Sequence, residues 1–441
     1  MRSSRSAQSP SRPLRRRPVM AVGTLAIASS LVLAGCSSSD DSGADDGATG
    51  GQVELTFMNQ SRGQEAALTE LAEKYTEETG VKITIDSPGP TDYLPKLQAK
   101  AQSGDMPDVY SSFNATDMAG FYKAGWAMDL SDELAGEWGE NFSPAVIELS
   151  TFKDGNNLDV PAGIYTAHWE VQTYGFLVDP DSTGLDQAKA PETMDEFIDG
   201  IAASGDGNFT VASSLTPQLI QSYASNWLTN EEISDTFDGK LPWESDGWRN
   251  AFQLLVDMKD AGILANDALP GGQDDNPNVE TAFFNNQEVG SIFDASPGVS
   301  VGLRTAPDYD SYFSLALPAA ADGTQEPRAL GLAGKGAVIN PKGDHPEEAL
   351  AFVKWLTEPD QQRVFAEQAW ILPSNPELLE GELPAQLAGF ASSIETMQVL
   401  ENTPTTDVNN AIKRDAQSLV LGEMTVDEVL ADLQAAQDLS Q

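Results

Sequence analysis

The chain has 441 residues, of which 68 are acidic and 25 are Lys or Arg, so its formal net charge is −43. Such acidity argues against nucleic acid as a partner and against docking on anionic lipid headgroups. The length and the 40% share of hydrophobic residues predict a globular protein with two domains or one large two-lobed unit.

The first 35 residues have the pattern of an export signal. An arginine-rich start precedes an apolar stretch, residues 19–34, which is too short to span a bilayer well. The stretch ends in Leu33-Ala34-Gly35-Cys36, which resembles a bacterial lipobox, and Cys36 is the only cysteine of the chain. We therefore expect residues 1–35 to be a signal peptide and Cys36 to be lipidated, with a plain secretory signal as the alternative. The paired arginines leave open whether export follows the general or the twin-arginine route.

Residues 36–52 predict a flexible tether. They are rich in Ser, Gly and Asp and contain few apolar side chains, so they have little to bury. The sequence after this segment has no further apolar run long enough to span a bilayer. A tether between a lipid and a folded body indicates a protein anchored to the extracellular face of the cell membrane.

From about Val53 onward, strand and helix signals alternate, which predicts α/β layers. The first strand is expected at 53–57, and Ser61 is expected to begin a helix with Gln64 as its capping-box partner. Gly80 should end that helix, because glycine favours the left-handed conformation of a helix C-cap. The further expected elements are strands at 81–85, 108–111 and 289–293, helices at 93–103, 193–203, 247–261, 407–421 and 425–439, and a helix that begins at Asp344 with Glu347 at its capping-box position.

Three polar residues follow the first predicted strand at the mouth of a helix, namely Asn59, Gln60 and Arg62. Open α/β sheets bind their ligands at the carboxyl ends of the strands. Amide and guanidinium groups form hydrogen bonds with polar groups of a ligand. We therefore expect these three residues to bind a ligand.

A resemblance to a known family rests on several segments whose order and spacing are more specific than any one of them. They are Lys96–Val109 with its Gly-Asp-Met-Pro-Asp-Val ending, Phe121–Leu130, Ala282–Gly290, Pro346–Thr357 with its Pro-Glu-Glu-Ala start, Ile371–Pro373, and Val420–Gly422 followed by Val426–Leu430. Together they are similar to the family 1 extracellular solute-binding proteins of ABC importers, which include maltose- and oligosaccharide-binding proteins. The resemblance runs from about residue 53 to the C-terminus.

The resemblance implies an α/β, two-lobed fold of the periplasmic-binding-protein type (type II). Lobe 1 would comprise residues 53–163 and 325–370, and lobe 2 would comprise residues 164–324 and 371–441. A hinge would close the lobes over a solute, and closure on a bridging ligand would signal occupancy to the permease subunits of an ABC importer. Such a protein is a monomeric carrier that needs no catalytic residue, cofactor or metal.

The resemblance also implies further ligand-binding residues. Phe113 and Asn114 follow the third predicted strand and match a ligand-facing loop of the family, and Tyr165 and Trp169 fall in the expected crossing between the lobes. The remaining candidates lie at or near cleft-facing positions of the family and are Trp227, Asp294, Trp370 and Asn409. Aromatic faces stack on the apolar faces of sugar rings, although a single tryptophan more often packs in a core.

Two departures from the family pattern concern the solute. Asp294-Ala295-Ser296 stands where many sugar binders carry Gly and then a stacking Trp, and Phe176–Asp179 stands where Tyr-Asn-x-Asp is usual. We expect a mono- or oligosaccharide as the solute. The alternative is a non-sugar solute such as a polyamine, for which acidic residues would dominate the cleft. The acidity of the chain fits that alternative, but it also fits a soluble protein from a salty habitat.

One motif points to an enzyme instead. Gly298-Val299-Ser300-Val301-Gly302 fits the Gly-x-Ser-x-Gly pattern of serine hydrolases, and His345 lies downstream. A nucleophile elbow needs its serine at a sharp turn from a strand into a helix. Here a helix is expected to start at Pro297 and to contain Ser300, which makes a secreted hydrolase the less favoured alternative.

Metal sites find little support in the sequence. The chain has two histidines and no cysteine after Cys36, so a zinc site would need distant carboxylates. Asp274, Asn276 and Asn278 start like a calcium loop, but position six of that loop is not Gly and position twelve is not Glu. We expect a polar loop there.

Overall fold

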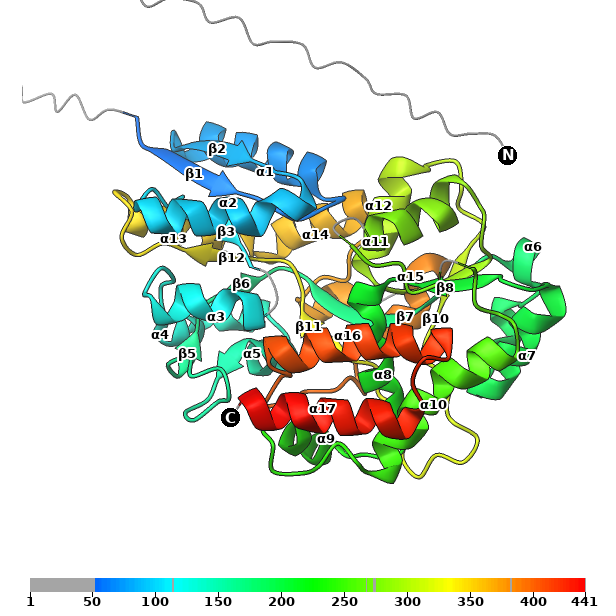
Figure 1. Ribbon diagram of the computed structural model, residues 1–441. Coiled ribbons are helices and arrows are strands. Elements are labelled where there is room, and N and C mark those ends of the chain that lie inside the picture. The colour runs from blue at the N-terminus through cyan, green and yellow to red at the C-terminus, as the bar shows by residue number, and fades with distance from the viewer. Residues whose placement is uncertain (1–51, 113–114, 267, 273–274, 381–382, 441) are drawn as a thin grey trace, which may run out of the picture. The chain divides into compact units, whose positions relative to one another are not determined.

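Two mixed β-sheets organise the residues that the computed structural model describes, which are 52–112, 115–266, 268–272, 275–380 and 383–440 (Figure 1). In spatial order, the strands of the first sheet are β2 (Lys82–Asp86), β1 (Glu54–Met58), β3 (Val109–Ser111), β12 (Gly336–Ile339) and β6 (Ala167–His168). Strand β1 is parallel to β2 and β3, whereas β12 is antiparallel to β3 and β6. The parallel strands place the ends of β1 and β3 at one edge of the sheet, where ligands of α/β proteins bind.

The second sheet is built around one long buried strand. In spatial order its strands are β10 (Phe313–Leu315), β7 (Val171–Val178), β9 (Ser291–Ala295) and β8 (Phe209–Val211), and β11 (Gly331–Ala333) also pairs with β7. Strand β7 is antiparallel to β9, β10 and β11, and β8 is parallel to β9. A short pair, β4 (Thr151–Phe152) with β5 (Gly163–Ile164), lies apart from both sheets.

Helices connect the strands in both parts of the chain. Those before β6 are α1 (Glu65–Thr79), α2 (Pro90–Ser103), α3 (Ala115–Lys123), α4 (Ser131–Leu134), η1 (Glu137–Asn141) and α5 (Pro144–Ser150). Directly after β12 come α13 (Pro346–Leu356) and α14 (Pro359–Ala369). Those between β7 and β11 are α6 (Pro180–Thr183), η2 (Gln187–Lys189), α7 (Met194–Ser204), η3 (Ser213–Leu215), α8 (Thr216–Ala224), α9 (Asn230–Phe237), α10 (Asp246–Asp260), α11 (Asp275–Glu280), the π-helical turn η4 (Thr281–Asn285) and α12 (Pro297–Thr305). The last ones are η5 (Pro376–Leu379), α15 (Ala385–Ser392), α16 (Thr406–Leu421) and α17 (Val426–Ser440).

Amphipathic helices cover the sheets for the expected reason. In α1, Leu68, Leu71 and Tyr75 lie on one face at helical spacing and are buried. They pack with Phe57 of β1 and Phe352 of α13 in one hydrophobic cluster. The α/β layers predicted from the alternating pattern are therefore confirmed.

Two predicted helix starts are wrong, and each has a local cause. The first helix begins at Glu65, because Gly63 has a φ of +83° that a helix does not allow. Gln64 is the N-cap residue and its side chain makes no capping hydrogen bond. The helix expected at Asp344 begins at Pro346, since a proline disfavours helical geometry in the residue before it. His345 is the N-cap there, without a side-chain bond, so the predicted role of Glu347 in a capping box is not found.

Three segments connect the two sheets and are hydrogen-bonded to one another. The chain leaves β6 and enters β7 through Trp169 and Glu170, and it returns from β11 to β12 through Gly334 and Lys335. The Trp169 amide donates to the Lys335 carbonyl at 3.1 Å, and the Gly334 amide donates to the Glu170 carbonyl at 2.7 Å. A third segment, residues 372–374, joins them, since the Val171 amide donates to the Leu372 carbonyl at 2.9 Å. The prediction that the chain crosses near Trp169 fits this path, while the proposed lobe boundaries stay predictions.

Some sequence predictions lie outside the described residues, namely those for the signal peptide, for the tether up to residue 51, for Cys36, and for Phe113 and Asn114. Within the described ranges, no helix combines the length and the apolar character that a bilayer crossing requires.

Candidate ligand-binding site

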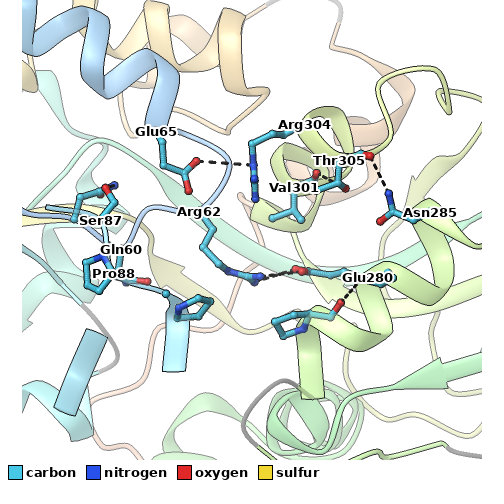
Figure 2. A pocket seen from close by; sticks show the side chains of 15 residues that line it. Gln60, Arg62, Glu65, Ser87, Pro88, Glu280, Asn285, Val301, Arg304 and Thr305 are labelled. Atoms are coloured by element: carbon cyan, nitrogen blue, oxygen red, sulfur yellow. Dashed lines mark hydrogen bonds and ion pairs between the residues drawn. The ribbon is translucent and has the colours of Figure 1, made fainter. Parts of the chain in front are cut away.

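A cavity of about 370 Å³ lies where loops of the first sheet meet helices that flank β9 of the second sheet. From the first side it is lined by the segment after β1, the start of α1 and the β2–α2 loop, and from the other side by α11, η4 and α12 (Figure 2). The lining residues are Asn59, Gln60, Arg62, Glu65, Ser87, Pro88, Gly89, Pro90, Pro277, Glu280, Thr281, Asn285, Val301, Arg304 and Thr305. Polar and charged side chains dominate this set, so the cavity is suited to a ligand rich in hydrogen-bonding groups.

The loop after β1 is held against the end of β3 by its own polar side chains. The Asn59 Oδ1 accepts the Ser61 amide at 2.9 Å and the Ser111 hydroxyl at 3.2 Å. The backbone amide of Gln60 donates to the Ser111 hydroxyl at 3.1 Å, and the side-chain Nε2 of Gln60 donates to the Ser112 carbonyl at 2.7 Å. These contacts fix both side chains at the sheet edge before any ligand arrives, which lowers the entropy that binding would cost.

Arg62 crosses the cavity and forms an ion pair with Glu280 (Figure 2). Its Nη1 and Nη2 atoms lie 2.9 and 3.0 Å from the two carboxylate oxygens, which is the strong bidentate geometry. Asn276 also donates to Glu280, at 3.1 Å. Burial raises the pKa of Glu280, and the Arg62 charge and hydrogen bond oppose that rise. Burial would lower the pKa of Arg62, but Glu280 and then Asp294 outweigh it, so the pKa is raised.

Asp294 lies behind this ion pair and is only 2% exposed. Burial, followed by the Glu280 charge, raises the pKa of Asp294 to about 8, while the Ala295 amide and Arg62 oppose the rise. Its Oδ1 accepts the Ala295 amide at 2.8 Å, but its Oδ2 has no hydrogen-bond partner among the described residues. A carboxyl group in such a place carries its proton at neutral pH.

A second, looser contact crosses the same cavity. The Arg304 Nε atom of α12 lies 3.9 Å from a carboxylate oxygen of Glu65, and both side chains are partly exposed. On the α12 side, Asn285 donates to the Thr305 carbonyl at 2.8 Å and so fixes η4 against the end of that helix. The wall formed by α11, η4 and α12 is therefore ordered by contacts of its own.

Three of the predicted ligand residues, Asn59, Gln60 and Arg62, line this cavity, and Asp294 lies next to it. Trp169 does not, since it is fully buried, stacks on Phe365 at 5.2 Å and donates its Nε1 to the Gln64 Oε1 at 2.8 Å. In the same network Gln64 donates to Glu170 at 2.7 Å. These bonds tie the loop that carries Arg62 to the first crossing segment.

The other predicted residues in the described ranges lie elsewhere. Tyr165 is 7% exposed, stacks on Tyr122 at 5.0 Å and donates its hydroxyl to the Pro161 carbonyl at 3.0 Å. Trp227 is half-buried and meets the edge of Tyr223 at 5.3 Å. Trp370 caps α14 in the left-handed conformation, and Asn409 lies in the first turn of α16. None of these four lines the cavity.

Glu280, Arg304 and Asn285 are among the lining residues that the sequence did not predict. Glu280 pairs with Arg62, which lies 218 positions away in the sequence, so no local sequence pattern predicts this ion pair. Residues 282–290, which resemble a family segment, begin two positions after Glu280, but that resemblance does not extend to Glu280 itself. Asparagine and arginine at the ends of short helices are otherwise typical of solvent-facing caps.

The serine of the Gly-x-Ser-x-Gly pattern is not built as a nucleophile. Ser300 lies within α12, is 1% exposed, and donates its hydroxyl to the Ala369 carbonyl. Of the two histidines, His168 has its Nδ1 at 2.7 Å from the Gly334 carbonyl and His345 lies 3.9 Å from Glu348. The expectation that Ser300 sits inside a helix is confirmed, and neither histidine is hydrogen-bonded to it.

The calcium-loop start also has another structure. Asn276 and Asn278 belong to helix α11 rather than to a loop, so the expected polar loop is wrong there, and Asp274 lies outside the described residues. Within the described ranges, no group of three or more His, Cys, Asp or Glu side chains is placed to hold a metal ion.

Residues 59–363 match the model of the bacterial extracellular solute-binding protein family, which covers more than half of the chain. The chain therefore belongs to this family of solute-binding proteins, which bind their solutes without catalysing a reaction. No curated protein matches the chain.

Solved structures show the same fold at low sequence identity. The maltose/maltodextrin-binding domain of Bdellovibrio bacteriovorus, bound to maltotriose, is 16% identical, with a TM-score of 0.67 over 88% of this chain and 99% of that one. An ABC transporter solute-binding protein of Thermotoga lettingae with α-D-tagatose is 16% identical, with a TM-score of 0.71 over 88% and 100%. A solute-binding protein in complex with raffinose is 18% identical, with a TM-score of 0.67 over 88% and 99%. These structures confirm the predicted two-lobed fold, and at such identity they show the fold alone.

Proposed function

We propose that the chain is the solute receptor of an ABC importer and that it captures a mono- or oligosaccharide. In this proposal the two sheet-bearing lobes close over the solute and the occupied form docks on the permease subunits. Family membership supports the receptor role. The similar structures with maltotriose, tagatose and raffinose support a sugar as the solute.

The observation that carries the proposal is the cavity to which both sides contribute hydrogen-bonding side chains. A sugar hydroxyl donates one hydrogen bond and accepts others, so it fits between an amide oxygen and an amide or guanidinium donor. Gln60 supplies such groups from the β1–α1 loop, and Asn285 and Arg304 supply them from the other wall. A solute that bridges the two walls would favour the closed form, which is how binding becomes a signal.

The predicted anchor completes the proposal. Signal-peptide removal before Cys36 and lipidation of its thiol would hold the receptor at the extracellular face of the membrane. Residues 36–52 would then span the distance between lipid and folded body, and the protein would act as a monomer beside its permease. Mass spectrometry of the N-terminal peptide tests this part, and an unmodified Cys36 would contradict it.

One feature of the cavity favours a second candidate, a cationic solute such as a polyamine. Glu65 and Glu280 line the cavity opposite Arg304 and Arg62, and the buried acid Asp294 lies behind them, so acidic residues outnumber arginines there by one. The described lining also contains no aromatic side chain on which a sugar ring could stack. Carboxylates bind an ammonium group directly, whereas a neutral sugar uses them only as hydrogen-bond acceptors.

A thermal-shift screen of the purified protein separates the two candidates. A ligand at a hundredfold excess over its Kd stabilises the folded state by about 2.7 kcal/mol, which gives a clear rise in Tm. A shift with one class of sugar supports the proposal and names the solute class. A shift with polyamines alone keeps the receptor role and discards the sugar, and no shift with sugars, polyamines, amino acids or short peptides contradicts the receptor role.

A further inference from the structure

The Arg62–Glu280 ion pair joins elements that belong to different sheets. Arg62 lies in the loop between β1 and α1 of the first sheet, and Glu280 ends α11, which precedes β9 of the second sheet. The Glu280 side chain is only 3% exposed and the Arg62 side chain 28%. The ion pair can form only while the β1–α1 loop and α11 are in contact. It therefore stabilises the contact between these two elements.

Burial makes the pair sensitive to the loss of either partner. A buried carboxylate without its cation is strongly unfavourable, so Glu280 without Arg62 must reach water or take up a proton. Asn276 is the other donor to Glu280, and Asp294 adds a further carboxyl group beside it. Withdrawal of Arg62 therefore leaves an acidic surface that favours separation of the two walls and their hydration.

The loop around Arg62 also fits closely against α12. Gly63 has a φ of +83°, and a Cβ atom built on it would lie 2.6 Å from the Ser300 Cβ. Glu65, the first residue of α1, and Arg304 of α12 add a second ion pair, at 3.9 Å. Close backbone packing and two ion pairs thus act at one place, next to the cavity.

We propose that Arg62 and Glu280 form a clamp that holds the two walls of the cavity together and thereby sets the affinity for the solute. The proposal rests on the solute-binding role for its effect on affinity, but the clamp itself is a property of the protein without solute. Apparent affinity scales with the population of the binding-competent form, so a residue that stabilises this form tightens binding without touching the solute. Arg62 and Glu280 thus act as positioning residues: they hold the two walls of the cavity in the binding-competent arrangement.

Reversal of the two charges tests the clamp. Arg62→Glu places two carboxylates face to face, Glu280→Arg places two guanidinium groups face to face, and the double variant restores an ion pair of opposite direction. Each variant is made in a Cys36→Ser chain with dyes on Glu73→Cys of α1 and Asp199→Cys of α7, two exposed positions on different sides. Single-molecule energy transfer between the dyes then reports the distance between the two sides without solute.

The clamp predicts that each single reversal shifts the energy-transfer distribution and that the double reversal returns it toward the parent. Solute affinity, measured by calorimetry, should fall by roughly tenfold or more in the single variants and recover in the double variant. Arg249→Glu is the control, since Arg249 pairs with Asp427 between α10 and α17 on one side of the cavity. It should leave both readouts unchanged.

Two results would overturn the clamp. Energy transfer that stays at the parent value in both single reversals shows that the pair does not hold the walls together. Loss of affinity without recovery in the double variant shows that Arg62 acts on the solute directly, and circular dichroism of each variant checks that it is folded. A protein in which energy transfer follows the predicted pattern but no solute binds would contradict the proposed function and leave the clamp standing.

Discussion

Asp294 is a residue whose surroundings change the pKa of its side chain. Its carboxyl group is buried at the end of β9, beside the Glu280 carboxylate, and its pKa is raised to about 8. In the unfolded chain the same group titrates near its ordinary value of 3.8. Between these two pH values the folded chain binds a proton that the unfolded chain has released.

This difference gives a pH dependence of definite sign. The contribution of Asp294 to stability is fully present below pH 4 and is lost as the pH rises toward 8, at up to about 1.4 kcal/mol per pH unit. Asp294→Asn cannot ionise, so its free energy of unfolding should exceed that of the parent by a margin that grows from pH 5 to pH 8. Urea unfolding of both proteins across this range measures the margin. A constant difference would show that Asp294 is ionised in the folded protein.

Among the elements, the loop between β1 and α1 forms one wall of the cavity and packs against α12. Gly63 and Gly80 both have positive φ values, +83° and +77°, and they begin and end the region of α1. A Cβ atom at Gly80 would meet nothing within 4 Å, whereas one at Gly63 would collide with Ser300. Both glycines thus adopt the left-handed backbone conformation, and they differ in whether another element lies against them.

The pair offers a matched comparison. Gly80→Ala should lose about 1–2 kcal/mol of stability, because alanine disfavours the left-handed region. Gly63→Ala should lose more, because its methyl group would also collide with Ser300. Only Gly63→Ala should also weaken solute binding, since its methyl group pushes the Arg62 loop away from α12. Chemical unfolding and calorimetric titration of both variants check this. Equal affinities in the two variants would mean that the loop and α12 need not touch for binding.

Local signals predicted most elements and failed where backbone geometry overrode them. The helices at 407–421 and 425–439 were expected from their apolar spacing and their break at Gly422, which has a φ of +75° as a C-cap. The start at Ser61 was wrong because Gly63, two positions before the first residue of α1, adopts a turn conformation as readily as a helical one. Gly63 packs against Ser300 of α12, which lies far along the chain, so no local pattern shows that contact.

On the scale of the whole molecule, the site divides into a predictable and an unpredictable half. Asn59, Gln60 and Arg62 were predictable, because the rule that ligands bind at the carboxyl edge of a sheet needs only a strand and the residues after it. The position of Glu280 in the site was not predictable from the sequence, because it depends on how the elements of the second sheet pack against those of the first. The predicted tryptophans do not line the cavity, and the burial of Trp169 and its hydrogen bond to Gln64 depend on tertiary contacts that no local pattern shows.

The three crossing segments explain how the two halves are coupled. Gln64 bonds to both Trp169 and Glu170 in the first crossing, while the residue two positions before it holds Glu280. A solute that touches the Arg62 loop therefore acts on an element that is already connected to the hinge. In a hinged protein such a contact biases the equilibrium between the open and closed forms.

The most direct test of the central claim is calorimetric titration of the parent protein and of Gln60→Ala with the solute that gives the largest thermal shift. Gln60 lines the cavity, and its side chain is hydrogen-bonded to Ser112 and Lys335 rather than to Arg62 or Glu280. We expect one solute per chain in the parent and an affinity roughly tenfold lower in Gln60→Ala, because one hydrogen bond of about 1.5 kcal/mol is lost. Equal affinity of the two proteins, or binding at several weak sites, would contradict the account that this cavity is where the solute is held.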